Sequence, residues 1–245
     1  MGLFKSSNPV LSDNILDKSF VMVNEGTMTV NGAINKTLIF LTILIASASG
    51  GFYLASTGQL PINAMFAGVF VALGLAFFAY FKPQYVMYIG SAYCLIEGVV
   101  VGGLSAIYSF VYPGIIAQAL ILTGAVLAGM LFLYKAKVIK VTEKFRSIIV
   151  MATAGIAIFY LIAFTLGFFG VSIPLLHSNG PMGIGFSLIV TVLAALNLLL
   201  DFDFIEKGSE KGLPKYMEWY GAFGLIVTLI WLYLEILRLL SKLRD

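Results

Sequence analysis

The sequence predicts an all-α polytopic membrane protein, because its composition is strongly apolar and it contains seven long apolar segments. Of its 245 residues, 60% are hydrophobic and 11% are charged, and the mean hydropathy is +0.99. Soluble domains have about 45–50% apolar and about 25% charged residues, so a soluble enzyme, a disordered chain and a nucleic-acid binder are excluded. Each segment has the roughly 17–25 residues that a helix needs to cross a bilayer. The segments are residues 37–55, 62–81, 85–108, 113–134, 147–169, 182–205 and 219–240.

The segments are predicted to be helices, because strands of a membrane barrel alternate apolar and polar residues, whereas these segments are continuously apolar. The lone cysteine, Cys94, excludes a disulfide framework and a cysteine-based metal site. The predicted organisation is an N-terminal tail at 1–36, a seven-helix bundle at 37–240 and a short C-terminal tail at 241–245.

The basic residues predict the orientation of the bundle in the membrane. Seven spans place the N-terminal tail and the second, fourth and sixth connections on one side, and this side carries twelve of the fifteen Lys and Arg residues. The three connections on the other side carry none. Lys and Arg accumulate on the cytoplasmic side, so we expect the N-terminus inside and the C-terminus outside.

Glu97 lies near the middle of the third segment, where a charge costs about 2.5–3.5 kcal/mol and is usually functional. Gly98 and Gly102 follow it with the spacing that lets a second helix approach closely. One interpretation is an ion-handling acid. The alternative is a protonated glutamate hydrogen-bonded to a neighbouring helix.

Asp201 and Asp203 lie at the end of the sixth segment. Two residues apart on a helix, they point about 200° away from one another, so they cannot share a face and at least one should face the bundle interior. The alternative is that both lie solvated at the membrane interface.

The seventh segment has a polar and small-residue stripe with spacings of three and four, which predicts a central helix that faces partners along its length. Glu235 can also simply pair with Arg238, three residues later. The residues of the stripe are Glu218, Gly221, Leu225, Thr228, Leu232 and Glu235.

Glu218 is expected at the same depth as Asp201 and Asp203, so the three carboxylates are predicted to cluster and to hold a calcium ion. Such a cluster would titrate as a coupled set, so conformation or flux should vary between about pH 5 and 8. We expect Asp203→Asn to remove most of that dependence. No tightly bound cofactor is expected, since the acids would meet calcium ions or protons in transit.

Several stretches resemble a bacterial branch of the Bax inhibitor-1 family: NPVL at 8–11, EGVVVGGLSA at 97–106, and the regions 218–225 and 231–240. The resemblance implies a seven-helix bundle with the last helix at its centre. It also implies a pH-sensitive calcium leak gated by an aspartate pair on the last two helices. The first of these aspartates falls on Asp203 or Asp201, whereas the second falls on Thr228, which does not ionise.

The sequence therefore favours a non-enzymatic calcium or proton leak in the lipid bilayer. Asp203, Asp201, Glu218, Glu97, Glu235 and Thr228 are its candidate residues. The alternative is a non-transporting regulator that binds a membrane-anchored protease or another integral membrane partner, for which the resemblance and the tail at 1–36 are the arguments.

Overall fold

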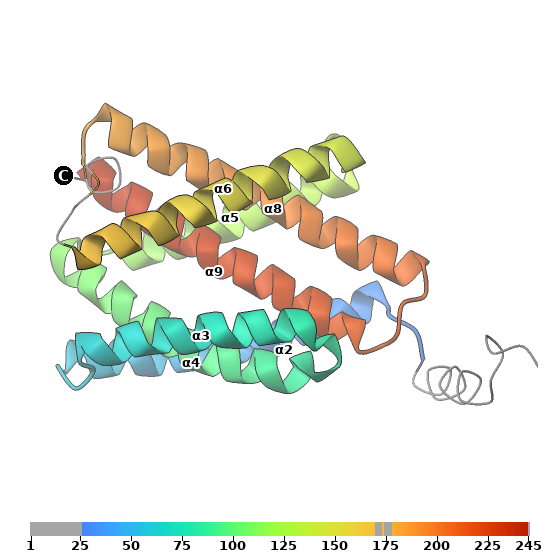
Figure 1. The fold of residues 1–245 in the computed structure, drawn as a ribbon, viewed down its shortest axis with the longest axis horizontal. Coiled ribbons are helices and arrows are strands. Elements are labelled where there is room, and N and C mark those ends of the chain that lie inside the picture. Colours follow the sequence, from blue (N-terminus) through green and yellow to red (C-terminus); the bar gives the residue numbers. More distant parts are fainter. Residues whose placement is uncertain (1–25, 170–172, 174–177, 245) are drawn as a thin grey trace, which may run out of the picture.

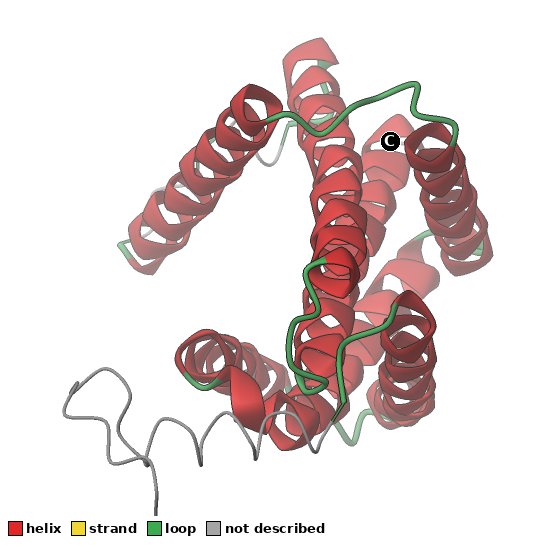
Figure 2. Ribbon diagram, turned by 90° about the vertical axis from the view of Figure 1, so that its right-hand side faces the viewer, coloured by secondary structure: helices red, strands yellow, loops and turns green. Residues whose placement is uncertain are grey.

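The computed structural model describes residues 26–169, 173 and 178–244, and within these ranges helices joined by loops and turns make up the structure, with one isolated β-bridge (Figure 2). Seven of its helices are long and apolar enough to cross a membrane, which confirms the predicted fold class. The long helices are α2 (Val30–Ser56), α3 (Ile62–Phe81), α4 (Val86–Val111), α5 (Ile115–Lys135), α6 (Glu143–Phe168), α8 (Pro181–Glu210) and α9 (Met217–Arg244). A 3₁₀ turn, η2 (Pro83–Tyr85), precedes α4.

The last helix, α9, is the centre of the bundle, as the sequence predicts (Figure 1). It packs against α2, α4, α5 and α8, while α3 lies outside α4 and α6 lies outside α8. Every residue of the predicted stripe on this helix is buried, from Glu218 at its start to Glu235 near its end. Burial of this stripe explains why polar residues are tolerated along it, since they meet other helices rather than lipid.

The closest packing joins α2 to α4 through the glycines that follow Glu97. A Cβ atom on Gly98 would lie 2.8 Å from the backbone oxygen of Leu44, and one on Gly102 would overlap the backbone of Ala48. The two backbones thus touch, as the small-residue spacing predicts, and the partner helix is α2.

In contrast, α6 packs loosely at the edge of the bundle. Ile149 is buried on this helix, but most of its described side chains are half-buried or exposed. Polar contacts attach α6 to the bundle. In one of them, the side-chain amide of Asn197 on α8 donates to Thr153 Oγ1 over 2.8 Å.

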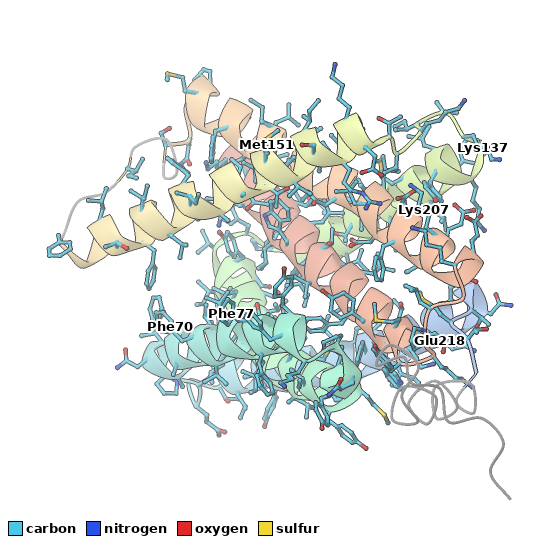
Figure 3. The ribbon with its side chains drawn as sticks, turned by 45° about the vertical axis from the view of Figure 1, so that its right-hand side comes forward. Phe70, Phe77, Lys137, Met151, Lys207 and Glu218 are labelled. Carbon is cyan, nitrogen blue, oxygen red and sulfur yellow. The ribbon has the colours of Figure 1, made fainter. Side chains whose placement is uncertain are left out.

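The helices extend past the apolar segments into polar sequence. The first begins at Val30 rather than at residue 37, with Thr29 as its N-cap, and α8 continues to Glu210. Lys137, Lys207 and Glu218 lie together at one end of the bundle, which we call the basic end (Figure 3). In Figure 1 α2 begins at this end and α9 finishes at the opposite end. That the basic end faces the cytoplasm stays a prediction.

Candidate functional site

A pocket of about 480 Å³ lies between α8 and α9, in the half of the bundle toward the basic end. Its remaining walls come from Ala76 and Tyr80 on α3 and from Arg146 and Val150 on α6. The polar groups that α8 and α9 contribute are the Asp201 carboxyl, the Tyr220 hydroxyl and the Thr228 hydroxyl. Helices from both sides of the bundle therefore meet around one acid.

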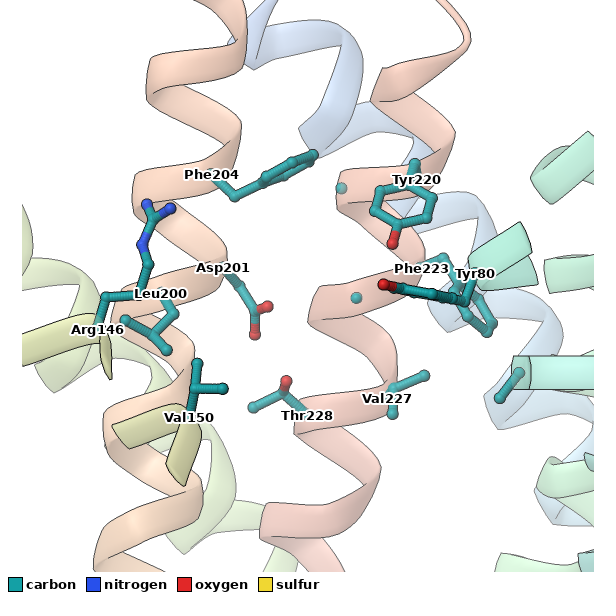
Figure 4. Close-up of a pocket in the computed structure, with 13 residues that line it drawn as sticks. Tyr80, Arg146, Val150, Leu200, Asp201, Phe204, Tyr220, Phe223, Val227 and Thr228 are labelled. Atoms are coloured by element: carbon teal, nitrogen blue, oxygen red, sulfur yellow. The ribbon is translucent and has the colours of Figure 1, made fainter. Parts of the chain in front are cut away.

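Asp201 points from α8 across this pocket toward Thr228 on α9 (Figure 4). The residue is half-buried, but its Oδ2 atom is fully buried and has no hydrogen-bond partner among the described residues. Native proteins leave few buried polar atoms unsatisfied, so each one calls for an explanation. An acid with an open oxygen beside a hydroxyl can bind a cation or exchange a proton.

Asp203 faces a different direction and has two cationic partners. Arg146 Nη2 donates to its Oδ2 over 2.6 Å, and Lys207 Nζ lies 2.9 Å from its Oδ1. The residue is 4% exposed, so both of its carboxyl oxygens are occupied in a buried position. The predicted divergence of the two aspartates is therefore observed, and Asp201 is the one that faces Thr228.

Glu218 anchors the start of α9 to the start of α2. Its Oε1 accepts hydrogen bonds from the backbone N–H and the hydroxyl of Thr29, over 2.9 and 3.0 Å, and its Oε2 pairs with Lys36. A Cβ atom on Gly32 would overlap the Glu218 carboxyl, so only glycine permits this approach. This glutamate is a fully paired structural anchor.

Glu235 forms a second closed network toward the opposite end of α9. Arg238 Nη1 donates to both of its carboxyl oxygens, over 3.0 and 3.1 Å, as the spacing of three residues predicts. Tyr160 on α6 donates to Oε1 over 2.9 Å and accepts from Arg238 over 2.6 Å. The network ties the loosely packed α6 to the central helix.

Glu97 is half-buried on α4 and forms no hydrogen bond or ion pair with the residues that the structure describes. The seam beside it belongs to the α2–α4 contact, and Glu97 does not line the pocket at Asp201. The structure therefore leaves it as an isolated acid on another helix.

The predicted cluster of Asp201, Asp203 and Glu218 does not form. Each carboxylate has its own surroundings, and within the described ranges no group of three or more His, Cys, Asp or Glu side chains is placed to hold a metal ion. The prediction of a three-carboxylate calcium site at these residues is therefore wrong. Equal depth does not bring side chains together when they leave their helices in different directions.

Sequence reasoning missed Lys36 and Arg146, which neutralise Glu218 and Asp203, and Tyr160, which hydrogen-bonds Glu235. Arg146 follows four lysines in one predicted connection, so only its orientation toward the bundle distinguishes it from them. Tyr160 is the single tyrosine in the segment 147–169, which is the one signal that could have drawn attention to it.

A model of Bax inhibitor 1-like proteins matches residues 8–245 of the chain. The chain belongs to the Bax inhibitor 1-like family. Together with the seven helices long and apolar enough to cross a membrane, membership makes the chain a multi-pass integral membrane protein. No curated protein matches the chain.

Proposed function

We propose that the chain is a pH-sensitive cation leak of the Bax inhibitor-1 type, with Asp201 and Thr228 as its ion-responsive site. The protein would pass calcium ions or protons across a bacterial inner membrane and would not act as an enzyme. The observation that carries this proposal is the buried, unpartnered Oδ2 of Asp201, which faces Thr228 between two helices.

The surroundings of Asp201 support a switch at this position. When the carboxyl is protonated, it can donate a hydrogen bond to the Thr228 hydroxyl and hold α8 against α9. When it is ionised, it attracts a cation into the pocket. Because ionisation of Asp201 increases as pH rises, flux should increase with the pH of the solution on the side of the basic end. Thr228 adds no second charge, so the response should have the shape of a single titration.

The test is flux into liposomes that contain a calcium-sensitive dye, measured between about pH 6 and 8 with the purified full-length chain. We expect flux that increases with pH in the wild type and loses this dependence in Asp201→Asn. Glu210→Gln removes one exposed charge from the same helix and serves as the matched control. Absence of flux at every pH contradicts the proposal.

A second candidate is a regulator that binds a membrane-anchored protease. The observation that favours it is the tight anchoring of residues 27–29: Thr27 forms a β-bridge with Pro214, and Met28 is 1% exposed. This contact fixes where the N-terminal region joins the bundle. The regulator predicts that deletion of residues 1–25, which lie outside the described residues, abolishes partner binding while Asp201→Asn leaves it intact.

A further inference from the structure

The walls of the Asp201 pocket are mostly aromatic and aliphatic, which suits an organic ligand better than a small inorganic ion. The pocket holds about 480 Å³, within the range of about 300–1,000 Å³ typical of sites for organic ligands. Aromatic residues from three helices line it, namely Tyr80, Phe204, Tyr220 and Phe223. The aliphatic walls come from α6, α8 and α9. Calcium, in comparison, requires six to eight oxygen ligands, and the side chains here cannot supply them.

Three of these rings contact other aromatic rings. Phe204 and Tyr220 pack against one another with ring centroids 5.7 Å apart, and Phe223 rests on Tyr93 at 5.1 Å. Figure 4 shows Tyr80, Tyr220 and Phe223 across the pocket from Asp201. Faces of aromatic rings attract cations, most of all where water is displaced.

The charge of Asp201 is available to a ligand. Arg146 also lines the pocket, but its guanidinium is bound to Asp203 at 2.6 Å. The buried Oδ2 of Asp201 has no partner in the described part of the chain. The pocket therefore combines one uncompensated carboxylate with an aromatic and aliphatic wall.

The pocket is open at the side of the bundle between α3 and α6. Tyr80 is 68% exposed, and the Arg146 side chain is 39% exposed, so these two residues border an entrance. Farther from the basic end, Phe70 on α3 and Phe164 on α6 are in ring contact, with centroids 5.6 Å apart. An amphiphilic molecule can enter laterally between α3 and α6, at a point nearer the basic end than the contact of Phe70 with Phe164.

We propose that this pocket binds an organic ammonium cation, with the charged nitrogen at Asp201 and the apolar body against Phe204, Tyr220 and Phe223. The proposal rests on Asp201 as the cation-responsive group of the proposed leak, but it does not require ion flux. The ammonium group can belong to a soluble lipophilic amine or to the headgroup of an aminophospholipid, and the experiment separates these sources.

The test measures thermal unfolding of the full-length protein in phosphatidylglycerol nanodiscs, titrated with benzyltrimethylammonium. Neopentylbenzene, which has the same shape and no charge, is the control ligand. A ligand that binds the folded state raises Tm in a concentration-dependent way. We expect stabilisation by the cation and none by its neutral isostere. Equal shifts with both ligands, or with neither, overturn the proposal.

The variants locate the site. Asp201→Asn should weaken binding about tenfold, because the attraction between the carboxylate and the quaternary nitrogen is lost. Tyr220→Leu should weaken it severalfold and Tyr220→Phe should not, because the proposed contact needs the aromatic ring and does not need the hydroxyl. Glu210→Gln should leave binding unchanged. Each variant's own Tm without ligand verifies that it folds, and unchanged affinity in Asp201→Asn overturns the assignment.

Two further arms complete the design. If phosphatidylethanolamine in the nanodiscs competes with benzyltrimethylammonium, the lipid headgroup is the source; if it does not, the ligand is a soluble amine. Dye-reported flux in the same preparations separates the two proposals. Flux that depends on Asp201 without ammonium binding overturns this inference alone, whereas binding without flux overturns the leak alone.

Discussion

The acids of α8 and α9 that are buried or half-buried fall into two groups, and the contrast between them identifies the site. Glu218, Glu235 and Asp203 are each 4% exposed or less, and each is bound to at least one Lys or Arg. Asp201 lies on the same helix as Asp203 but has an unpartnered buried oxygen. Paired acids stabilise helix contacts, whereas an unpaired acid remains available to ions. The following substitutions test this distinction, from the largest expected effect on stability to the smallest.

Arg238→Leu should have the largest effect, since it leaves Glu235 buried without a counter-charge. We expect a loss of about 2–3 kcal/mol in the free energy of unfolding, reduced from that of a fully buried pair because Arg238 is about a third exposed. Unfolding in mild detergent measures it. The double variant Glu235→Gln/Arg238→Leu should recover most of the lost stability. If it does not, the loss comes from the packing of the Arg238 side chain rather than from the unpaired charge of Glu235.

Lys36→Met should cost less, because Glu218 keeps both hydrogen bonds from Thr29 after the ammonium is lost. The expected loss is about 1–2 kcal/mol, measured by the same unfolding transition. Lys82→Met, which removes an exposed cation from the α3–α4 connection, is the control and should have little effect. A larger loss in the control than at Lys36 would contradict the paired role of Glu218.

Asp203→Asn should cost about 0.5–1 kcal/mol, because both of its partners are 39% exposed and water replaces much of the interaction. Flux should keep the wild-type dependence on pH, in contrast to the expectation from sequence that Asp203 carries it. Dye-loaded liposomes measure the profile. If flux in Asp203→Asn does not vary with pH, Asp203 and its two cationic partners carry the pH dependence and Asp201 does not.

Asp201→Asn should change the free energy of unfolding least, by about 0.5 kcal/mol or less in either direction, since its buried Oδ2 has no protein partner and an asparagine can keep the hydrogen bond with Thr228. It should nevertheless remove the rise of flux with pH. Thr228→Val is the companion variant, which removes the facing hydroxyl at nearly constant volume. Destabilisation of Asp201→Asn comparable to that of Arg238→Leu would show that Asp201 is a structural acid after all.

Local spacing explains what could be predicted about the site. The pairing of Glu235 with Arg238, the divergence of Asp201 from Asp203 and the glycine seam after Glu97 follow from the period of one helix. Helix ends were less predictable, because counting apolar residues omits polar turns such as those between Val30 and Lys36. Such turns stay helical when an N-cap residue accepts hydrogen bonds from their backbone N–H groups and a neighbouring helix pairs with their polar side chains.

The sequence by itself determined the seven spans, the central last helix and the faces of α9, since length, apolarity and helical period depend only on neighbouring residues. Only the tertiary structure decided which acids are neutralised by cations of other helices. Lys36 and Glu218 are 182 residues apart, and Arg146 and Asp203 are 57 apart. Such pairs depend on how separate helices rotate and slide against one another, which no local pattern encodes. The open oxygen of Asp201 is what that arrangement leaves unpaired.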